Sequence, residues 1–242
     1  AVGAGELHLA GIWSHLACAD QPGAPQNARQ RDRFEQAVAR AADMGLYPEV
    51  RHLANSAAAL TDPSMRYDLV RCGIASYGLS PDFATLGPAA QWGLRPAMRL
   101  AARLALVKRV PAGEGVSYGY MHRTKSETTL ALIPVGYAEG LPRLATGAAK
   151  IWVNGETHDL AARIAMDQFV LDVGEHEVAP GDTVVIFGDP ALGYPSADDL
   201  AEAAQTINYE IVTGGLLWDA GRAITTSALI LLTAPALLAT LK

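Results

Sequence analysis

The sequence predicts an α/β protein in two parts, a partial β/α barrel of the TIM type followed by a C-terminal β domain. Up to about residue 80, short apolar runs alternate with a helical pattern, which favours parallel strands joined by helices. From residue 98 onward, apolar residues recur at every second position, which is typical of half-exposed strands. We place the barrel part at residues 1–92, the β domain at 93–222 and an atypical apolar tail at 223–242.

The first part contains three apolar runs that predict strands, at residues 7–16, 49–54 and 69–76. Between the first two, Phe34, Val38, Ala41 and Ala42 recur at three- or four-residue steps with charged residues between them. This spacing predicts a helix over residues 26–46. A short helix beginning at Ser56 should follow the second strand.

Several polar residues lie at or near the ends of these predicted strands: His15, Asn55, Ser56, Arg71 and Gly73. In a closed β/α barrel the functional groups lie at the C-terminal ends of the strands. A serine at the start of a helix is either a plain N-cap or part of an anion site built from free backbone N–H groups. Gly73 would let a backbone N–H approach a ligand closely.

The second part begins after a stretch rich in Pro, Gly and Ala, residues 81–96, which we interpret as a linker. Alternation over residues 98–106 predicts a strand. The pair Asn154–Gly155 between apolar segments predicts a hairpin, because both turn positions tolerate positive φ. Residues 183–187 predict a further strand.

Charge and cysteine content exclude several classes of function. The 242 residues carry a net charge of -6 without a run of Lys or Arg, so no nucleic acid or anionic membrane partner is expected. Cys18 and Cys72 cannot form a disulfide framework, which fits the cytoplasm. The histidines show no metal-ligand spacing, so we assign no metal.

The two ends of the chain are unusual. The first residue is not Met, and the absence of a basic start argues against a signal peptide; truncation fits better than processing. Residues 223–241 carry no charge and are long enough to span a membrane. Pro235, several threonines and the absence of flanking aromatic residues argue against that interpretation. A buried terminal helix and a divergent or out-of-frame tail are the alternatives.

The chain contains seven distinctive short segments, Ser14-His15, Ala54-Asn55-Ser56, Arg71-Cys72-Gly73-Ile74, Val116-Ser117-Tyr118-Gly119, Gly136-Tyr137-Ala138-Glu139-Gly140, Met166-Asp167-Gln168 and Thr206-Ile207-Asn208-Tyr209-Glu210. Their content and order resemble those of alanine racemases, which use pyridoxal 5'-phosphate (PLP). Each segment alone also fits an ordinary core or turn. Together they make the chain resemble this family over residues 8–213.

The resemblance implies a racemase of L- and D-alanine that supplies cell-wall precursors. It implies that Tyr118 is an acid/base and that His15 is its hydrogen-bonding partner. A tyrosine hydroxyl ordinarily titrates at about pH 10, so it needs cationic or hydrogen-bonding neighbours. The implied cofactor-binding residues are Asn55, Ser56, Arg71, Gly73, Ile74 and Tyr209. The implied residues near the substrate are Tyr137, Met166 and Asp167. The implied assembly is a head-to-tail homodimer with shared sites.

Arg71 matches the family's contact to the nitrogen of the cofactor ring. An arginine donates hydrogen bonds but keeps its proton, so the ring stays unprotonated and withdraws electrons more weakly. A rim arginine paired with a carboxylate is the alternative.

The chain also departs from the family. Its four lysines, Lys108, Lys125, Lys150 and Lys242, do not lie in the motif of the lysine that binds the cofactor covalently. The family's Asp-Thr-Gly-Met-x-Arg segment has no counterpart, and Ala161-Ala162-Arg163 replaces Gly-Arg. We therefore expect the chain alone to be inactive.

Three alternatives remain open. The chain is a racemase for serine or several amino acids, or a degenerate protein that only dimerises or binds PLP or phosphate. A metal-assisted PLP dehydratase is the third, and the absence of a His/Cys pair at ligand spacing argues against it.

Overall fold

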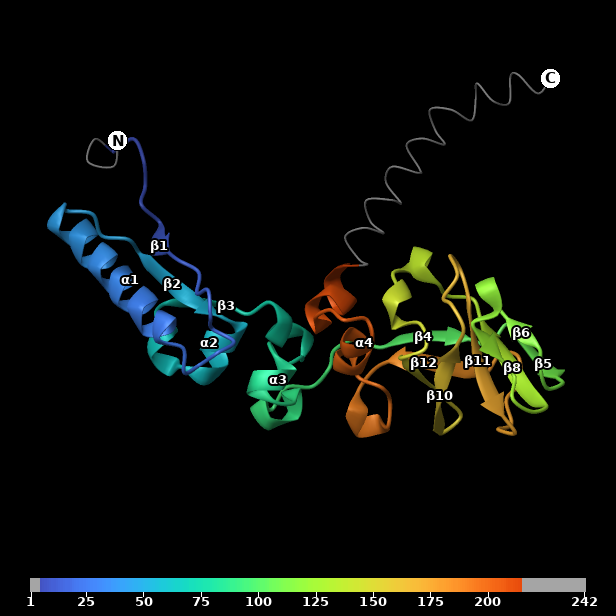
Figure 1. Ribbon diagram of the computed structural model, residues 1–242. Helices are drawn as coiled ribbons and strands as arrows, with labels where there is room; N and C mark the ends of the chain where they lie inside the picture. Colours follow the sequence, from blue (N-terminus) through green and yellow to red (C-terminus); the bar gives the residue numbers. More distant parts are fainter. Residues whose placement is uncertain (1–4, 215–242) are drawn as a thin grey trace, which may run out of the picture. The chain divides into compact units, whose positions relative to one another are not determined.

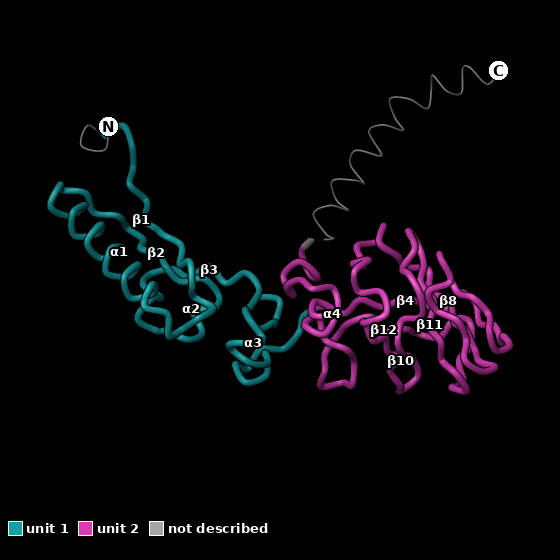
Figure 2. The backbone as a smooth tube through the Cα atoms, viewed as in Figure 1, with its two compact units in different colours: residues 1–97 teal, residues 98–242 magenta. Residues whose placement is uncertain are grey.

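The structure, a computed structural model, describes residues 5–214. The chain forms two compact units, residues 1–97 and 98–242, which Figure 2 shows in different colours. Residues 93–97, which we expected in the second domain, belong to unit 1. The tail predicted at 223–242 lies outside the described residues. Among residues 5–214, no helix has the length and apolar character needed to cross a membrane.

Unit 1 is built on a parallel sheet in the order β1-β2-β3, connected by helices (Figure 1). Its strands are β1 Gly11–Trp13, β2 Val50–Asn55 and β3 Leu69–Arg71. Its α-helices are α1 Pro25–Asp43, α2 Ser56–Thr61 and α3 Phe83–Leu86. The predicted alternation of parallel strands and helices is confirmed.

Helix α1 joins β1 to β2 and covers the sheet. Pro25 at its first turn has the backbone conformation a helix start needs, and Gly45 just beyond its end takes φ +72°. Its Phe34 packs with Leu53 of β2 and Ala57 of α2 in one buried cluster. This apolar contact fixes one face of the sheet and leaves the other face open for polar groups.

Two local predictions in unit 1 are wrong. The strand predicted over 69–76 ends at Arg71, and a 3-10 helix follows at Ile74–Tyr77 with Gly73 at its N-cap. The segment predicted as a linker, residues 81–96, is folded. The Asp82 side chain caps α3 by accepting from the Thr85 N–H, and the Trp92 indole donates to the Leu86 carbonyl at 2.8 Å.

Unit 2 is built on a seven-stranded antiparallel sheet in the order β4-β12-β9-β10-β11-β8-β5 (Figure 1). The strands are β4 Leu100–Arg103, β5 Leu106–Val110, β8 Thr128–Ile133, β9 Lys150–Val153, β10 Glu156–Ala161, β11 Phe169–Gly174 and β12 Thr183–Phe187. A small hairpin pairs β6 Gly115–Val116 with β7 His122–Arg123, and helix α4 spans Ala197–Ala203. The side chains of Ile151, Leu171 and Ile186 are fully buried in the core of unit 2.

Sequence predictions for unit 2 are largely confirmed. Asn154 and Gly155 take φ +46° and +96° between β9 and β10, as a tight hairpin turn requires. Strand β12 has the predicted bounds. The strand predicted over 98–106 is instead divided between β4 and β5, which lie at opposite edges of the sheet.

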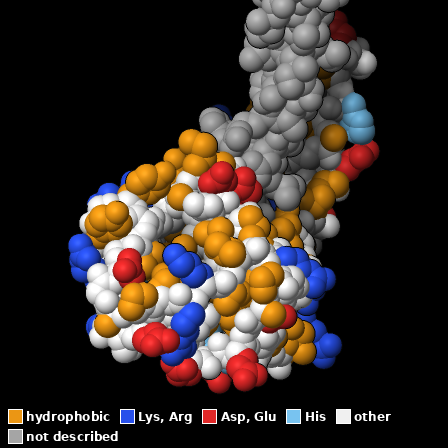
Figure 3. Space-filling view, turned by 90° about the vertical axis from the view of Figure 1, so that its right-hand side faces the viewer, with side chains coloured by type: hydrophobic (Ala, Val, Ile, Leu, Met, Phe, Trp, Pro, Cys, Tyr) orange, Lys and Arg blue, Asp and Glu red, His pale blue; other side chains and the backbone are white. Residues whose placement is uncertain are grey.

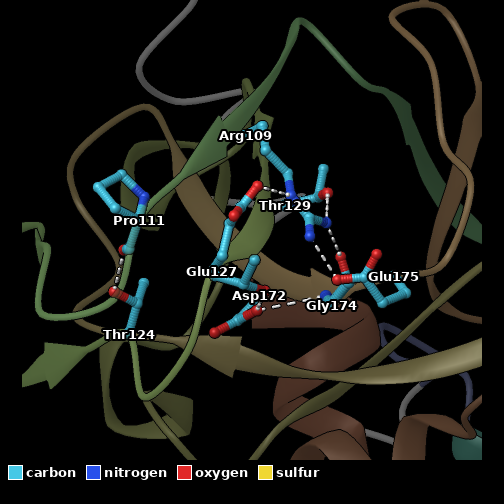
Figure 4. Close-up of polar contacts among 9 residues, drawn as sticks. Arg109, Pro111, Thr124, Glu127, Thr129, Asp172, Gly174 and Glu175 are labelled. Carbon is cyan, nitrogen blue, oxygen red and sulfur yellow. Dashed lines mark hydrogen bonds and ion pairs between the residues drawn. The ribbon is translucent and has the colours of Figure 1, made fainter.

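Arg109 fastens the β5 edge of this sheet to the turn after β11 (Figure 4). Its guanidinium donates to Glu127 at 3.0 Å, to Glu175 at 2.5 Å and to the Gly174 carbonyl at 3.3 Å. The guanidinium holds the pKa of Glu175 below its usual range through the hydrogen bond. Through Arg109, the turn after β11 is therefore bound to β5 and to the residue that precedes β8.

Candidate active site

The three parallel strands of unit 1 end at one edge of the sheet. Most of the predicted cofactor residues lie at or directly after these strand ends. Arg71 closes β3, Asn55 closes β2, and His15 lies two residues beyond β1. This grouping confirms the expectation that the strand ends bring these residues together.

Arg71 is the centre of this group. Its Nε donates to Nε2 of His52 at 2.6 Å, and its Nη2 lies 3.3 Å from Nδ1 of His15. Its guanidinium also lies over the Trp13 ring, 4.9 Å from the ring centre, a cation–π contact. Because arginine has five N–H groups in one plane, some remain for a further acceptor.

His52 holds Arg71 in place, and sequence reasoning missed it. The ring is buried, 4% exposed, and its Nδ1 lies 2.8 Å from the Leu69 carbonyl oxygen. Since a carbonyl only accepts, Nδ1 carries the hydrogen, and Nε2 is free to accept from Arg71. The contact therefore needs neutral His52 in one tautomer. The only signal in the sequence was a histidine within an apolar strand.

These groups face a pocket of about 300 Å³ on the sheet. It is lined by Gly11, Ile12, Trp13, Val50, His52, Leu69 and Arg71. Trp13 is 65% exposed, so the pocket is open to solvent in the isolated unit. An aromatic ring with a nitrogen acceptor would fit beside the guanidinium.

A second feature at the same edge suits an anion. Asn55, and not Ser56, is the N-cap of α2: its side chain accepts from the Ala58 N–H at 3.1 Å. Ser56 is buried, and its Oγ accepts from the Ala75 N–H at 3.3 Å. This bond joins the start of α2 to the turn that contains Gly73 and Ile74. The starts of both short helices therefore adjoin, and the Ser56 hydroxyl can still donate.

The remaining predicted residues belong to unit 2. Tyr118 begins the 3-10 helix Tyr118–Tyr120 between β6 and β7, and its side chain is 68% exposed. The preceding Ser117 has φ +57° and donates from Oγ to the Arg163 carbonyl at 3.0 Å. Residues 117–120 line a pocket of about 580 Å³ together with Arg163, Ala165 and residues 168–170.

Tyr137 and Met166 lie side by side beyond Arg163. The Tyr137 N–H donates to the Ala165 carbonyl at 3.1 Å, and the Ala138 N–H donates to the Met166 carbonyl at 2.7 Å. Tyr137 and Met166 are both exposed, as is the neighbouring Asp167. The segment 163–168 therefore connects three of the predicted groups: Tyr118, Tyr137 and Met166–Asp167.

Tyr209 lies after α4, in unit 2, whereas the other predicted cofactor residues lie in unit 1. Its neighbour Asn208 donates to Asp198 of α4 at 2.7 Å, and burial raises the pKa of Asp198. The Thr213 hydroxyl donates to the Tyr209 carbonyl at 2.6 Å.

Comparison with known proteins identifies the family. Residues 2–81 match the family model "Alanine racemase, N-terminal domain", and residues 97–216 match "Alanine racemase, C-terminal domain". The alanine racemase of Streptomyces coelicolor is 54% identical over 209 residues, which are 86% of this chain and 53% of that protein. That of Frankia casuarinae is 53% identical, over 86% of this chain and 54% of its own length.

Solved structures give the same result. The alanine racemase from D-cycloserine-producing Streptomyces lavendulae superposes with a TM-score of 0.85 at 55% identity, covering 88% of this chain and 55% of its own. The alanine racemase from Bacillus anthracis, with bound L-Ala-P, gives 0.78 at 36% identity over 88% of this chain and 54% of its own. The chain spans about half the length of the relatives it matches. The chain belongs to the alanine racemase family.

Proposed function

We propose that the protein is the catalytic polypeptide, or a large part of it, of a PLP-dependent alanine racemase. It would interconvert L- and D-alanine in the cytoplasm for peptidoglycan synthesis. The observation that carries the proposal is the Arg71 guanidinium at the end of β3, held by His52 of β2, together with the joined helix starts at Ser56 and Gly73.

The donor groups of unit 1 fit PLP. Arg71 would donate to the ring nitrogen, while Asn55, Ser56, Gly73 and Ile74 would hold the phosphate together with Tyr209. When bound, PLP withdraws electrons and so acidifies the Cα–H of the amino acid. Because Arg71 cannot give up its proton, it would leave the ring neutral and restrain side reactions.

Tyr118 would move a proton to or from the substrate Cα, with His15 as its hydrogen-bond partner. Tyr137, Met166 and Asp167 would shape the space around a small amino acid. In unit 2, Tyr118, Tyr120, Met121 and Met166 each expose more than half of their side chains. Figure 3 shows hydrophobic side chains interspersed with charged ones on the face turned toward the viewer. Such exposure supports a head-to-tail homodimer in which these residues meet a second copy.

The decisive experiment adds the parts of a full-length relative that have no counterpart in this chain. A chimera would place residues 5–214 between the unmatched parts of the S. coelicolor relative, and the production of D-alanine from L-alanine would be measured with PLP. The chimera should racemise alanine, whereas the 242-residue chain alone should not. A chimera that folds and binds PLP but stays inactive would support the alternative, a protein that only binds PLP or dimerises. L-Serine in the same assay tests the broader racemase.

His52 should be a positioning residue for Arg71. In the chimera, His52→Leu removes the acceptor that holds the Arg71 Nε–H, so the exposed guanidinium is no longer fixed in one position. We expect PLP affinity to fall by about 2- to 12-fold, the equivalent of one hydrogen bond worth about 0.5–1.5 kcal/mol, measured by titration of the absorbance spectrum. His52→Gln, which can still accept, should recover part of the affinity, and His8→Gln should change nothing. Equal affinity in His52→Leu would contradict the role.

A further inference from the structure

Three ionisable side chains that the proposed function does not use meet in unit 2. Glu156 and His158 are two residues apart on β10, so both side chains project from the same face of the strand. His176 lies in the turn that follows β11, the antiparallel neighbour of β10. The end of β11 therefore returns beside the start of β10, where all three side chains converge.

The contacts among them are close. Nε2 of His158 lies 2.7 Å from Nδ1 of His176, and the same Nδ1 lies 3.9 Å from a carboxylate oxygen of Glu156. The ring planes differ by 21°, with centres 4.9 Å apart. The distance between the ring centres exceeds the distance between the two nitrogens by about the width of one imidazole ring. The two rings therefore meet edge to edge, through these nitrogens. One of these two nitrogens therefore donates the shared hydrogen, and the other accepts it with its lone pair.

The backbone around the cluster is firmly held. The His176 N–H donates to the Val173 carbonyl at 3.0 Å, and the adjacent Glu175 is bound by Arg109 at 2.5 Å (Figure 4). On the other side, the Asn154–Gly155 turn fixes the start of β10, with Asn154 donating to Asp182 at 2.6 Å. The positions of the three groups thus depend on two anchored turns.

We propose that Glu156, His158 and His176 bind one divalent transition-metal ion of the zinc class. One carboxylate and two imidazoles are a donor set that zinc takes, at about 2.0–2.2 Å, with a water in the fourth position. Around a tetrahedral ion, two ring nitrogens lie farther apart than the 2.7 Å seen between His158 and His176. Metal binding would therefore move the two rings apart. The hydrogen shared between Nε2 of His158 and Nδ1 of His176 would move to the other nitrogen of the ring that carries it. The exposed Glu156 side chain is free to close on the ion.

Such an ion would tie β10 to the turn after β11. Because it binds only the folded arrangement, it would stabilise unit 2. Sequence spacing did not reveal this site, and our assignment of no metal rested on spacing alone. The two histidines lie 18 residues apart and meet only because their strands pair.

The test is a calorimetric titration of the tag-free 242-residue chain with Zn²⁺, followed by Co²⁺ as a spectroscopic probe. We expect one ion per chain, a higher melting temperature with metal, and Co²⁺ absorption bands of four-coordinate geometry. His176→Ala should lower Zn²⁺ affinity by more than the roughly 10- to 100-fold loss that outer-shell changes cause. Glu156→Gln, an exposed position, should also weaken binding and keeps the test valid if His176→Ala does not fold.

His8→Ala is the matched control, because His8 lies 3.1 Å from Glu49 but makes only a two-group pair. It should bind Zn²⁺ like the unaltered chain. Absence of stoichiometric binding would overturn the site, as would equal affinity in Glu156→Gln and His176→Ala. Equal loss in His8→Ala would place the ion elsewhere and overturn it as well.

Discussion

Replacing Tyr118 by Phe in the racemase chimera should lower kcat by about 10²- to 10⁴-fold, the usual contribution of a general acid or base. Only the hydroxyl is lost, and the side chain is 68% exposed in the chain, so folding should be unaffected. PLP affinity should stay the same because Tyr118 lies outside the groups that hold the cofactor.

Isotope exchange makes this prediction specific. If Tyr118 serves one face of the substrate, Tyr118→Phe should abolish exchange of the Cα hydrogen with D₂O for one enantiomer while the other still exchanges. Tyr47→Phe is the matched control, since Tyr47 is also an exposed tyrosine, at 75%, and is not one of the predicted site residues. Full activity in Tyr118→Phe, or an equal loss in Tyr47→Phe, would refute the assignment.

The meeting of strand ends could be predicted because parallel strands place their C-terminal ends at one edge. His15, Asn55 and Arg71 follow from that rule. His52 does not, because its role depends on strand register: it lies opposite Trp13 in β1 and beside Leu69 in β3. A sequence gives the alternation of a strand, but it does not give the register between strands.

The segment before Met166 illustrates a second limit. The resemblance places Ala162 where relatives carry glycine, and Ala162 takes φ +66°, a conformation that favours glycine. Ser117 and Tyr120 also have positive φ on either side of Tyr118. In this turn of strained backbone, the Tyr118 side chain is exposed to solvent and is not packed in the core. Periodicity cannot foresee it, because it arises in turns.

Gly136→Ala should damage both folding and the space around the substrate. A Cβ at Gly136 would lie 2.4 Å from the carbonyl oxygens of Ala165 and Met166, and these backbone atoms cannot rotate away. Overpacking of this kind costs about 1–3 kcal/mol, and a clash with backbone belongs at the upper end. We expect a lower urea midpoint for the 242-residue chain and, in the chimera, a higher KM for alanine.

The KM effect follows from the hydrogen bonds at this contact. Forcing Gly136 outward lengthens the bonds from Tyr137 and Ala138 to the 165–166 segment, now 3.1 and 2.7 Å, and so separates Tyr137 from Met166. Gly23→Ala is the control, because its Cβ would meet nothing within 4 Å and its φ is not in the left-handed region. If Gly136→Ala matched Gly23→Ala in stability and KM, the close contact would have no role in shaping the site. A drop in stability with unchanged KM would confine its role to folding.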